Sequence, residues 1–367
     1  MKTVAFVRAS NIYDDSRASK EISALIEAGY KVVILGWNRD GNAKEKTQAL
    51  FENANVGIRF YECSVKNGIG LRNISKLLRF ILWVKKNLEI SNPDYVHACD
   101  LDAGLGSFLF CKSKRKKLVY DIFDYYIDSR NMPKPMQFVV EKMEIIIINF
   151  ASATIICTEE RKIQISKAHP QKIIVLHNSP EVEAIVDEEI EYDYAYCGAL
   201  CQRRLVAEIL KDYKKYSNLN ICFAGYGEFA HLAEENGRLF PSFTFKGAVP
   251  YAEVLDIESK CRCLAAIYEP TIRNHRLCAP NKFYEALALA KPIIVCKGTG
   301  IDKIVKENEI GFVIDYDSSQ FYAAVEKIKN NPEQSVLMGR KARNLYERNY
   351  KWSVMKQRLI EMYKELA

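Results

Sequence analysis

The sequence lacks any apolar run long enough to cross a membrane. A spanning helix needs about 20 consecutive apolar residues, and no stretch of the 367 residues reaches that length. The chain also begins directly with a strand-like run, Lys2 to Val7, instead of a charged segment followed by the apolar core of a targeting peptide. We therefore expect a protein that stays in the cytoplasm.

Paired cysteines are also missing, although the chain contains 11 cysteines. There is no CxxC motif, and Cys261 with Cys263 has no second pair that would complete a zinc site. Many of the cysteines lie in strand-like segments, where a free thiol packs as a small hydrophobic group. The sequence predicts reduced structural thiols and no metal site.

Glycine is absent from the first strand-to-helix turn, Val7 to Ser16. A GxGxxG dinucleotide fingerprint or a P-loop needs glycines there so that the backbone can approach phosphates. NAD-dependent redox chemistry and P-loop ATPase activity are therefore not expected. Arg8, Asn11 and Asp15 on this turn either contact a substrate or are solvated loop residues.

Charge is distributed unevenly between the two halves. Residues 1–180 hold 27 Lys and Arg against 19 Asp and Glu, whereas the remaining residues hold 26 against 27. A basic half suggests an anionic partner such as a phospholipid or a phosphorylated acceptor. Nucleic acid is not expected, because the chain has no recognition motif and no base-stacking pattern.

Strand-like runs alternate with helix-like segments along the whole chain, which is typical of parallel sheets covered by helices on both faces. The pattern stops at Pro180 and resumes at Tyr194. Between them, Glu181 to Asp193 contains seven acids and neither a basic residue nor a glycine, as an interdomain connection would. The sequence predicts two Rossmann-like domains, 1–180 and 194–350, with ligands at the carboxyl ends of the strands.

Two turns of the second half are candidate phosphate sites. The turn from Gly198 to Arg204 precedes a helix predicted over Arg203 to Tyr216. Cations at a helix start oppose the helix dipole unless an anion lies between them, so Arg203 and Arg204 either bind phosphate or are solvent-exposed. The second turn contains Gly225 and Gly227, which either admit a ligand close to the backbone or form a plain turn.

The turn from Pro280 to Glu285 is the most informative. Free N–H groups at the start of the helix predicted over Asn281 to Ala290 suit a diphosphate, and Lys282 adds a positive charge. Glu285, one turn deeper, either accepts hydrogen bonds from ribose hydroxyls or only complements the helix dipole. With these residues we include Asn281 and Phe283 in the predicted nucleotide site.

Several further motifs follow one another over nearly the full length of the chain. Their sequences and their order resemble those of the family 4 glycosyltransferases, which have the GT-B fold and retain anomeric configuration. The resemblance implies two Rossmann-like domains that face each other across a cleft and a C-terminal helix, 351–367, that crosses back to the N-terminal domain. The motifs are PDYVHACD, KIIVLHNSPE, YCGAL, GYGE, FKGAVPYAEV, PNKFYEALALAKPII, GTG and YKWSVMKQRLIEMYKEL.

The resemblance also assigns roles in the C-terminal half. Glu285 matches the second acid of the family's E-x7-E element, which binds the nucleotide ribose, and Arg203 or Arg204 takes the place of the basic residue that faces the diphosphate. The first acid is replaced by Leu277. That departure leaves the contacts to the donor sugar in doubt.

A second departure lies in the N-terminal half, where Phe123 stands at the position of a histidine near the reacting centre. Asp121, Asp124, or His97 with Asp100 would supply polar contacts instead. Alternatively, His97 is a packed residue at a strand end.

The implied reaction moves a sugar from a nucleotide diphosphosugar, by default a UDP-sugar, to a hydroxyl of a glycan or lipid-linked acceptor, in cell-surface polysaccharide synthesis. Lys282 with Arg203 or Arg204 would stabilise the departing diphosphate, so neither cofactor nor metal is expected. Two alternatives stay open. One is a nucleotide-sugar epimerase of the same fold, and the other is a non-catalytic nucleotide- or partner-binding relative, which Leu277 and Phe123 make plausible.

Residues 66–86 contain six cations and no acid, interleaved with apolar residues. Helices of this composition lie in membrane interfaces, and residues 112–117 add five more cations that an anionic leaflet would attract. The chain would then be a peripheral protein on the inner face of the cell membrane. The alternative is an ordinary core helix with solvated lysines.

Overall fold

The computed structural model describes residues 1–13, 15–39, 41–52, 56–64, 74–130, 132–182 and 189–367. The chain divides into two compact units. Unit 1 consists of Met1–His177 and Met355–Ala367, and unit 2 of Asn178–Val354. Each unit has its own parallel sheet, and the last helix, α14 (Trp352–Glu365), returns the chain to unit 1. The predicted α/β fold class with two Rossmann-like sheets is confirmed.

The sheet of unit 1 has seven parallel strands in the order β3-β2-β1-β4-β5-β6-β7. Its central strands are apolar along most of their length because helices cover both faces. The strands are β1 (Thr3–Arg8), β2 (Lys31–Asn38), β3 (Val56–Glu62), β4 (Tyr95–Cys99), β5 (Lys117–Ile122), β6 (Ala153–Ile156) and β7 (Ile173–Val175).

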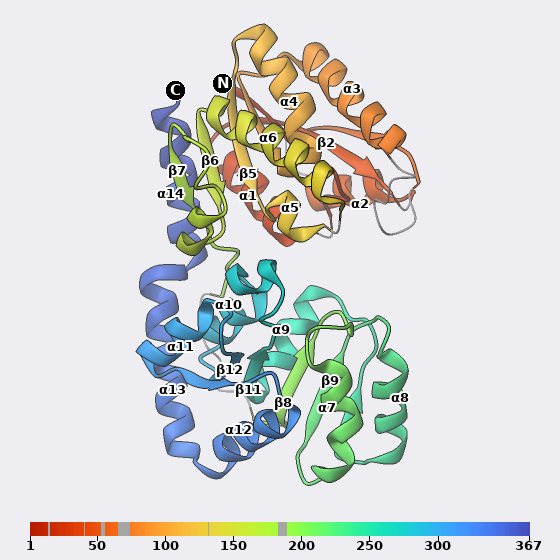
Figure 1. Ribbon diagram of the computed structural model, residues 1–367, viewed down its shortest axis with the longest axis vertical. Helices are drawn as coiled ribbons and strands as arrows, with labels where there is room; N and C mark the ends of the chain where they lie inside the picture. The colour runs from red at the N-terminus through yellow and green to blue at the C-terminus, as the bar shows by residue number, and fades with distance from the viewer. Residues whose placement is uncertain (14, 40, 53–55, 65–73, 131, 183–188) are drawn as a thin grey trace. The chain divides into compact units, whose positions relative to one another are not determined.

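Three helices lie side by side on one face of this sheet: α3 (Ile74–Ser91), α4 (Asp100–Lys114) and α6 (Lys134–Phe150) (Figure 1). Helix α4 approaches α3 closely because Gly106 has no side chain, and a Cβ there would lie 2.6 Å from the carbonyl oxygen of Ile81. The remaining helices of unit 1 are α1 (Ser16–Glu27), α2 (Ala43–Leu50), α5 (Tyr126–Ser129) and the 3-10 helix η2 (Glu159–Ile163).

Alternation along the strands separates the two faces of the unit 1 sheet. Val96 and Ala98 of β4 join the core beneath α3 and α4. Between them, His97 points to the opposite face, where its ring contacts Tyr363 of α14. Within the described ranges, no helix is long and apolar enough to cross a membrane.

The sheet of unit 2 has six strands in the order β10-β9-β8-β11-β12-β13. The side chains of β8 alternate between two cores: Tyr194 and Tyr196 enter one, while Ala195 and Cys197 enter the other. The strands are β8 (Tyr192–Cys197), β9 (Ile221–Ala224), β10 (Phe243–Phe245), β11 (Cys261–Ala266), β12 (Ile293–Cys296) and β13 (Gly311–Ile314).

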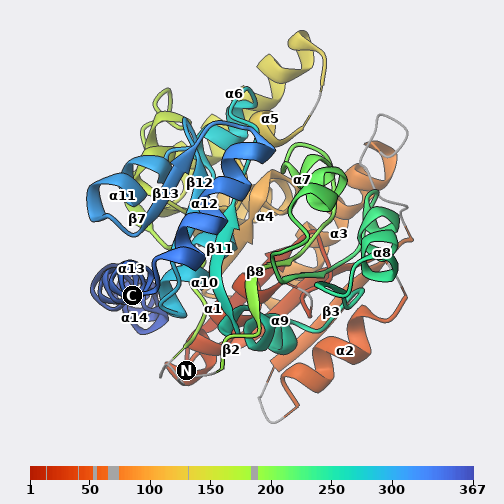
Figure 2. The same cartoon turned by 90° about the horizontal axis from the view of Figure 1, so that it is seen from below.

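Helices cover both faces of the unit 2 sheet. Helix α12 lies across β8, β11 and β13 (Figure 2), and α9, α10 and α11 pack against strands from β8 to β13. The helical segments are α7 (Val206–Asp212), η3 (Tyr213–Lys215), α8 (Ala230–Leu239), α9 (Tyr251–Ser259), η4 (Arg273–Leu277), α10 (Asn281–Ala288), α11 (Ile301–Asn308), α12 (Ser318–Asn330), α13 (Pro332–Leu345) and the π-helical turn η5 (Tyr346–Tyr350).

The predicted start of one helix was wrong. The segment expected to be helical from Arg203 begins only at Val206, because Arg203 and Leu205 have positive φ angles of 68° and 58°. These angles lie outside the right-handed helical region. Arg203 and Arg204 therefore precede the helix, and the argument from its dipole does not apply to them.

The acidic connection also differs from the prediction at its end. Strand β8 begins at Tyr192, so Asp193 is a strand residue with only 4% of its surface exposed. Its carboxylate accepts hydrogen bonds from Arg262 Nε at 3.1 Å and Lys329 Nζ at 2.8 Å. Asp193 thus anchors neighbouring elements of unit 2. Residues 183–188 of the predicted connection lie outside the described residues.

Candidate functional site

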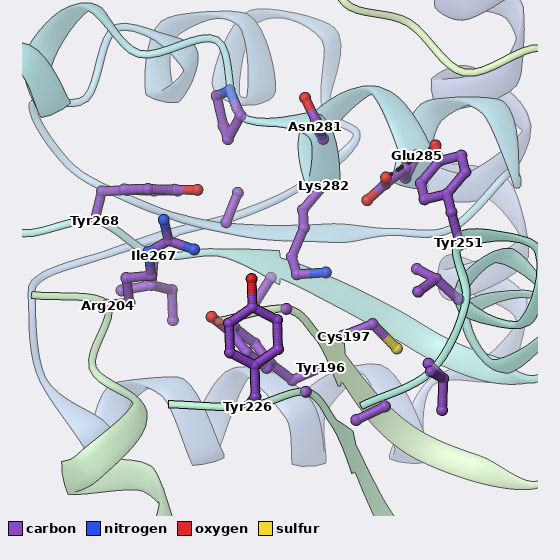
Figure 3. Close-up of a pocket in the computed structure, with 18 of the residues that line it drawn as sticks. Tyr196, Cys197, Arg204, Tyr226, Tyr251, Ile267, Tyr268, Asn281, Lys282 and Glu285 are labelled. Atoms are coloured by element: carbon purple, nitrogen blue, oxygen red, sulfur yellow. Dashed lines mark hydrogen bonds between the residues drawn. The ribbon is translucent and has the colours of Figure 1, made fainter. Parts of the chain in front are cut away.

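A cavity of about 430 Å³ lies in unit 2 at the carboxyl ends of β8, β9 and β11, beside the start of α10. Its volume falls in the range of small-molecule sites. Figure 3 shows Lys282 between two groups of side chains, Arg204 with Tyr268 on one side and Glu285 with Tyr251 on the other. Positive and negative side chains therefore occupy different parts of one cavity.

The glycine turns form the floor of this cavity by packing against each other. Gly225 has a φ of +148°, and a Cβ on it would lie 1.8 Å from the carbonyl oxygen of Gly198. Gly225 N also donates to Gly247 O at 2.6 Å. Gly198 and Gly225 line the cavity, whereas Gly227 packs against the backbone of Leu200. Gly225 and Gly227 are thus required so that the turns can pack against each other, whether or not a ligand also approaches the backbone there.

Lys282 is the more deeply placed of the two lining cations. Its side chain is 11% exposed, and Nζ lies 2.9 Å from Glu258 Oε1 and 5.1 Å from the centre of the Tyr196 ring. Burial lowers the pKa of Lys282, but the carboxylates of Glu258 and Glu285 outweigh this effect and raise the pKa above its ordinary value. Lys282 therefore carries a positive charge at neutral pH.

The structure distinguishes between Arg203 and Arg204. Arg204 lines the cavity, with its guanidinium 5.3 Å from the centre of the Tyr268 ring. Arg203 is not among the lining residues, and its carbonyl oxygen accepts a hydrogen bond from Glu269 N at 3.0 Å. Arg204 and Lys282 are therefore the cations available to an anionic ligand in the cavity.

Helix α10 presents one face to the cavity and the other to the core. Asn281, Lys282 and Glu285 line the cavity, and Glu285 Oε1 accepts a hydrogen bond from the Tyr251 hydroxyl at 3.2 Å. Phe283 is only 1% exposed and packs against Tyr284 and Tyr350 in the core. The structure thus places Phe283, which the sequence had included in its predicted nucleotide site, in the core and not among the residues that line the cavity.

Sequence reasoning missed Glu258 of α9. Glu258 has no exposed surface, and its carboxylate reaches Lys282 on the neighbouring helix. The signal was available, because Val254, Ile257 and Glu258 fall on one face of a helix at spacings of three and four residues. An acid within an otherwise buried face requires a partner, and Lys282 is that partner.

In unit 1, His97 is fully buried. Its Nδ1 lies 3.0 Å from the Tyr363 hydroxyl, its Nε2 lies 3.3 Å from Asp121 Oδ2, and its ring stacks on Phe6. A direct role at a reacting centre would require this packing to open. Ligand-type atoms of His97, Cys99 and Asp121 lie within 4.8 Å of one another, but Arg17 already donates to Asp121 Oδ1 at 2.6 Å.

Asp124 lies nearer the surface, with 54% of its side chain exposed, and pairs with Arg161 at 3.2 Å. Asp100 accepts hydrogen bonds from the backbone N–H groups of Phe123 and Asp124 and pairs with Arg8. The Phe123 ring lies 4.1 Å from the Arg8 guanidinium. These side chains gather at the carboxyl ends of β1, β4 and β5, which is the expected edge for ligands.

Each of the two units has a parallel sheet, and unit 2 holds a charged cavity at its strand ends, as in α/β proteins of the GT-B fold. Residues 195–331 match the family model described as Glycosyl transferases group 1. This match covers most of unit 2 and supports a glycosyltransferase enzyme. A search of curated proteins gave no match.

Solved structures agree with this fold over the whole chain. A glycosyltransferase from Rickettsia africae is 12% identical, with 99% of this chain and 98% of that chain covered and a TM-score of 0.73. HepE from Anabaena, in complex with UDP and glucose, is 14% identical, with complete coverage of both chains and a TM-score of 0.69. TarM from S. aureus, in complex with Fondaparinux, alpha-GlcNAc-glycerol and UDP, is 12% identical, covers 99% and 100%, and has a TM-score of 0.71. At these identities the likeness shows the fold alone.

Proposed function

We propose that the enzyme transfers a sugar from a nucleoside diphosphosugar, UDP-linked by default, to a hydroxyl of a glycan or lipid-linked acceptor, with retention, in cell-surface polysaccharide synthesis. The observation that carries the proposal is the arrangement of Arg204, Lys282 and Glu285 in one cavity. UDP in the structures of HepE and TarM supports the choice of nucleotide.

The cavity provides complementary groups for each part of such a donor. The diphosphate would contact Lys282 and the N–H groups at the start of α10, with Arg204 nearby. The ribose hydroxyls would donate to Glu285, whose carboxylate the Tyr251 hydroxyl orients. When the sugar leaves, negative charge develops on the diphosphate, and the fixed cations stabilise it without reorganisation of solvent. Retention agrees with attack from the side of the leaving phosphate, which would accept the proton of the acceptor hydroxyl.

A nucleotide screen followed by turnover assays tests the proposal. UDP at about 100 times its dissociation constant should stabilise the protein by about 2.7 kcal/mol, and GDP and TDP serve as comparisons. With a UDP-sugar and acceptor, UDP should be released and the glycan extended. Conversion of the UDP-sugar to its epimer without release of UDP would favour an epimerase, and absence of stabilisation by all three nucleotides would contradict the donor site.

We propose further that unit 1 docks on the cytoplasmic leaflet of an anionic membrane. One face of α3, including Phe80, Ile81 and Val84, is buried in the core, so that part of the predicted apolar surface cannot reach lipid. A separate ridge on α3 remains exposed, with Leu78 and Leu82 at 56% and 64% exposure. Residues 66–73 of the predicted segment lie outside the described residues.

Cations and further apolar side chains accompany the ridge on the same helix layer. Arg79 and Lys86 of α3 are exposed, and exposed Lys and Arg residues follow at the end of α4 within 112–117. Helix α6 adds exposed Phe138, Val139, Met143 and Ile146. Apolar side chains that enter a lipid interface and cations that attract anionic headgroups are the two contributions that hold peripheral helices on membranes.

Vesicle cosedimentation tests this docking. The protein should bind vesicles containing anionic phospholipid and show little binding to neutral ones, and the double variant Leu78→Ser/Leu82→Ser should lose most of the binding. Val336→Ser/Leu337→Ser is the matched control, because these residues of α13 are exposed to a similar extent, 55% and 53%. Equal binding to neutral and anionic vesicles would refute the electrostatic part, and unchanged binding of the α3 variant would refute the ridge.

A further inference from the structure

Two glutamates, Glu258 and Glu285, lie close to Lys282, which lines the cavity of unit 2. Glu258 lies on α9 with no exposed surface, and its Oε1 accepts a hydrogen bond from Lys282 Nζ at 2.9 Å. Its second oxygen, Oε2, is fully buried and has no hydrogen-bond partner within the described part of the chain. A buried ionised carboxylate is costly unless both oxygens are compensated. Among the described residues, Lys282 therefore compensates one of the two carboxylate oxygens of Glu258.

The other titratable groups around Glu258 do not stabilise its ionised form. Glu285 of α10 is a second carboxylate that repels the charge on Glu258 and can accept a hydrogen bond from Glu258 only when Glu258 is protonated, and Tyr251 of α9 donates to Glu285. The thiols of Cys197 on β8 and Cys261 on β11 are also close, and burial raises the pKa of each thiol, so both stay neutral. Lys282 thus opposes both carboxylates, Glu258 and Glu285.

Burial, followed by repulsion from Glu285, raises the pKa of Glu258 to about 8 in spite of the attraction to Lys282. The carboxyl group therefore changes charge near pH 8. A diphosphate that enters the cavity adds negative charge near Glu258. It also competes with Glu258 for the positive charge of Lys282. Both effects favour the protonated form of Glu258.

We propose that Glu258 is a proton-coupled positioning residue of the donor site, which holds Lys282 in place and, wherever it is ionised in the free protein, binds one proton from solvent when a nucleoside diphosphate enters the cavity. The inference rests on the proposed function, since it requires that the cavity binds such a ligand. Its consequence is that donor and product affinity depend on pH through a residue that does not contact the nucleotide. Below the pKa of Glu258, the proton is already present and binding is independent of pH; above it, binding weakens as pH rises.

Calorimetric titration of the full-length enzyme with UDP measures the coupling directly. At pH 8, in buffers of different ionisation enthalpy, the slope of the observed enthalpy against the buffer enthalpy gives the number of protons bound. Because about half of the chains would carry ionised Glu258 at that pH, the wild type should take up about half a proton. At pH 8 the phosphates of UDP are almost fully ionised, so they contribute little to the proton uptake. UDP affinity should fall up to about tenfold per pH unit above pH 8.

Two variants assign the proton. Glu258→Gln keeps a hydrogen-bonding group beside Lys282 but cannot titrate, so it should bind UDP with no proton uptake and a flat pH profile. Glu253→Gln, on the exposed side of the same helix, should behave as the wild type. Proton uptake that persists in Glu258→Gln, or UDP binding by the wild type with no uptake at pH 8, would overturn the proposal and leave the proposed function intact. Absence of UDP binding at any pH would overturn both.

Discussion

Lys282→Ala should lower kcat/KM for sugar transfer by about 10²- to 10³-fold, the range found when a single charge-stabilising group is removed from an active site. The lysine is positively charged, 11% exposed and aimed into the cavity, so solvent does not screen it as it screens a surface charge. The effect should appear in kcat as well as in KM, because the charge on the diphosphate grows as the sugar departs.

The fold should survive this substitution. Removal of Lys282 leaves Glu258 buried without its cation, but a carboxyl group whose pKa is already raised to about 8 avoids the cost by remaining protonated at neutral pH. Lys297→Ala is the control, since Lys297 is an exposed lysine of the same unit. Steady-state kinetics with a UDP-sugar, together with a thermal unfolding curve, provide the measurement. A well-folded Lys282→Ala enzyme with activity within twofold of the wild type would show that the diphosphate lies elsewhere.

Helical spacing could have placed the residues of α10 correctly from the sequence alone. At about 100° per residue, Asn281, Lys282 and Glu285 lie on one side of a helix and Phe283 lies on the other. Phe283 was included because it stood inside the motif, and it packs in the core instead. The motif identified the helix, whereas the period of the helix determines which of its residues face the cavity.

Other features were not accessible to sequence reasoning. His97 alternates with Val96 and Ala98, but both faces of a parallel sheet are covered, so alternation alone cannot separate a buried histidine from one at the surface. The positive φ of Arg203 is equally unpredictable, because a non-glycine residue adopts it only under constraint from surrounding structure. Both uncertainties concern local geometry. The overall fold could be predicted from the sequence, but the burial of His97 and the backbone angle of Arg203 could not.

Gly225→Ala should produce the largest loss of stability among single substitutions at the site. The added Cβ would lie 1.8 Å from the carbonyl oxygen of Gly198, and neither turn can yield easily, because Gly225 N is bonded to Gly247 O and Gly198 N to Ala224 O. A backbone atom, unlike the end of a flexible side chain, cannot rotate away from the clash. The φ of +148° adds strain, since L residues rarely adopt it.

We expect a loss of about 3 kcal/mol or more in the free energy of unfolding, measured by urea denaturation, and a parallel loss of UDP binding because the floor of the cavity moves. Gly247→Ala separates the two causes. Gly247 also has a positive φ, +65°, but a Cβ there would meet no atom within 4 Å, so it should cost only about 1 kcal/mol. The difference between the two variants measures the contact between turns together with the greater backbone strain at +148°. Equal losses would mean that backbone strain alone explains the glycines, and that the close packing of Gly198 against Gly225 does not constrain the donor cavity.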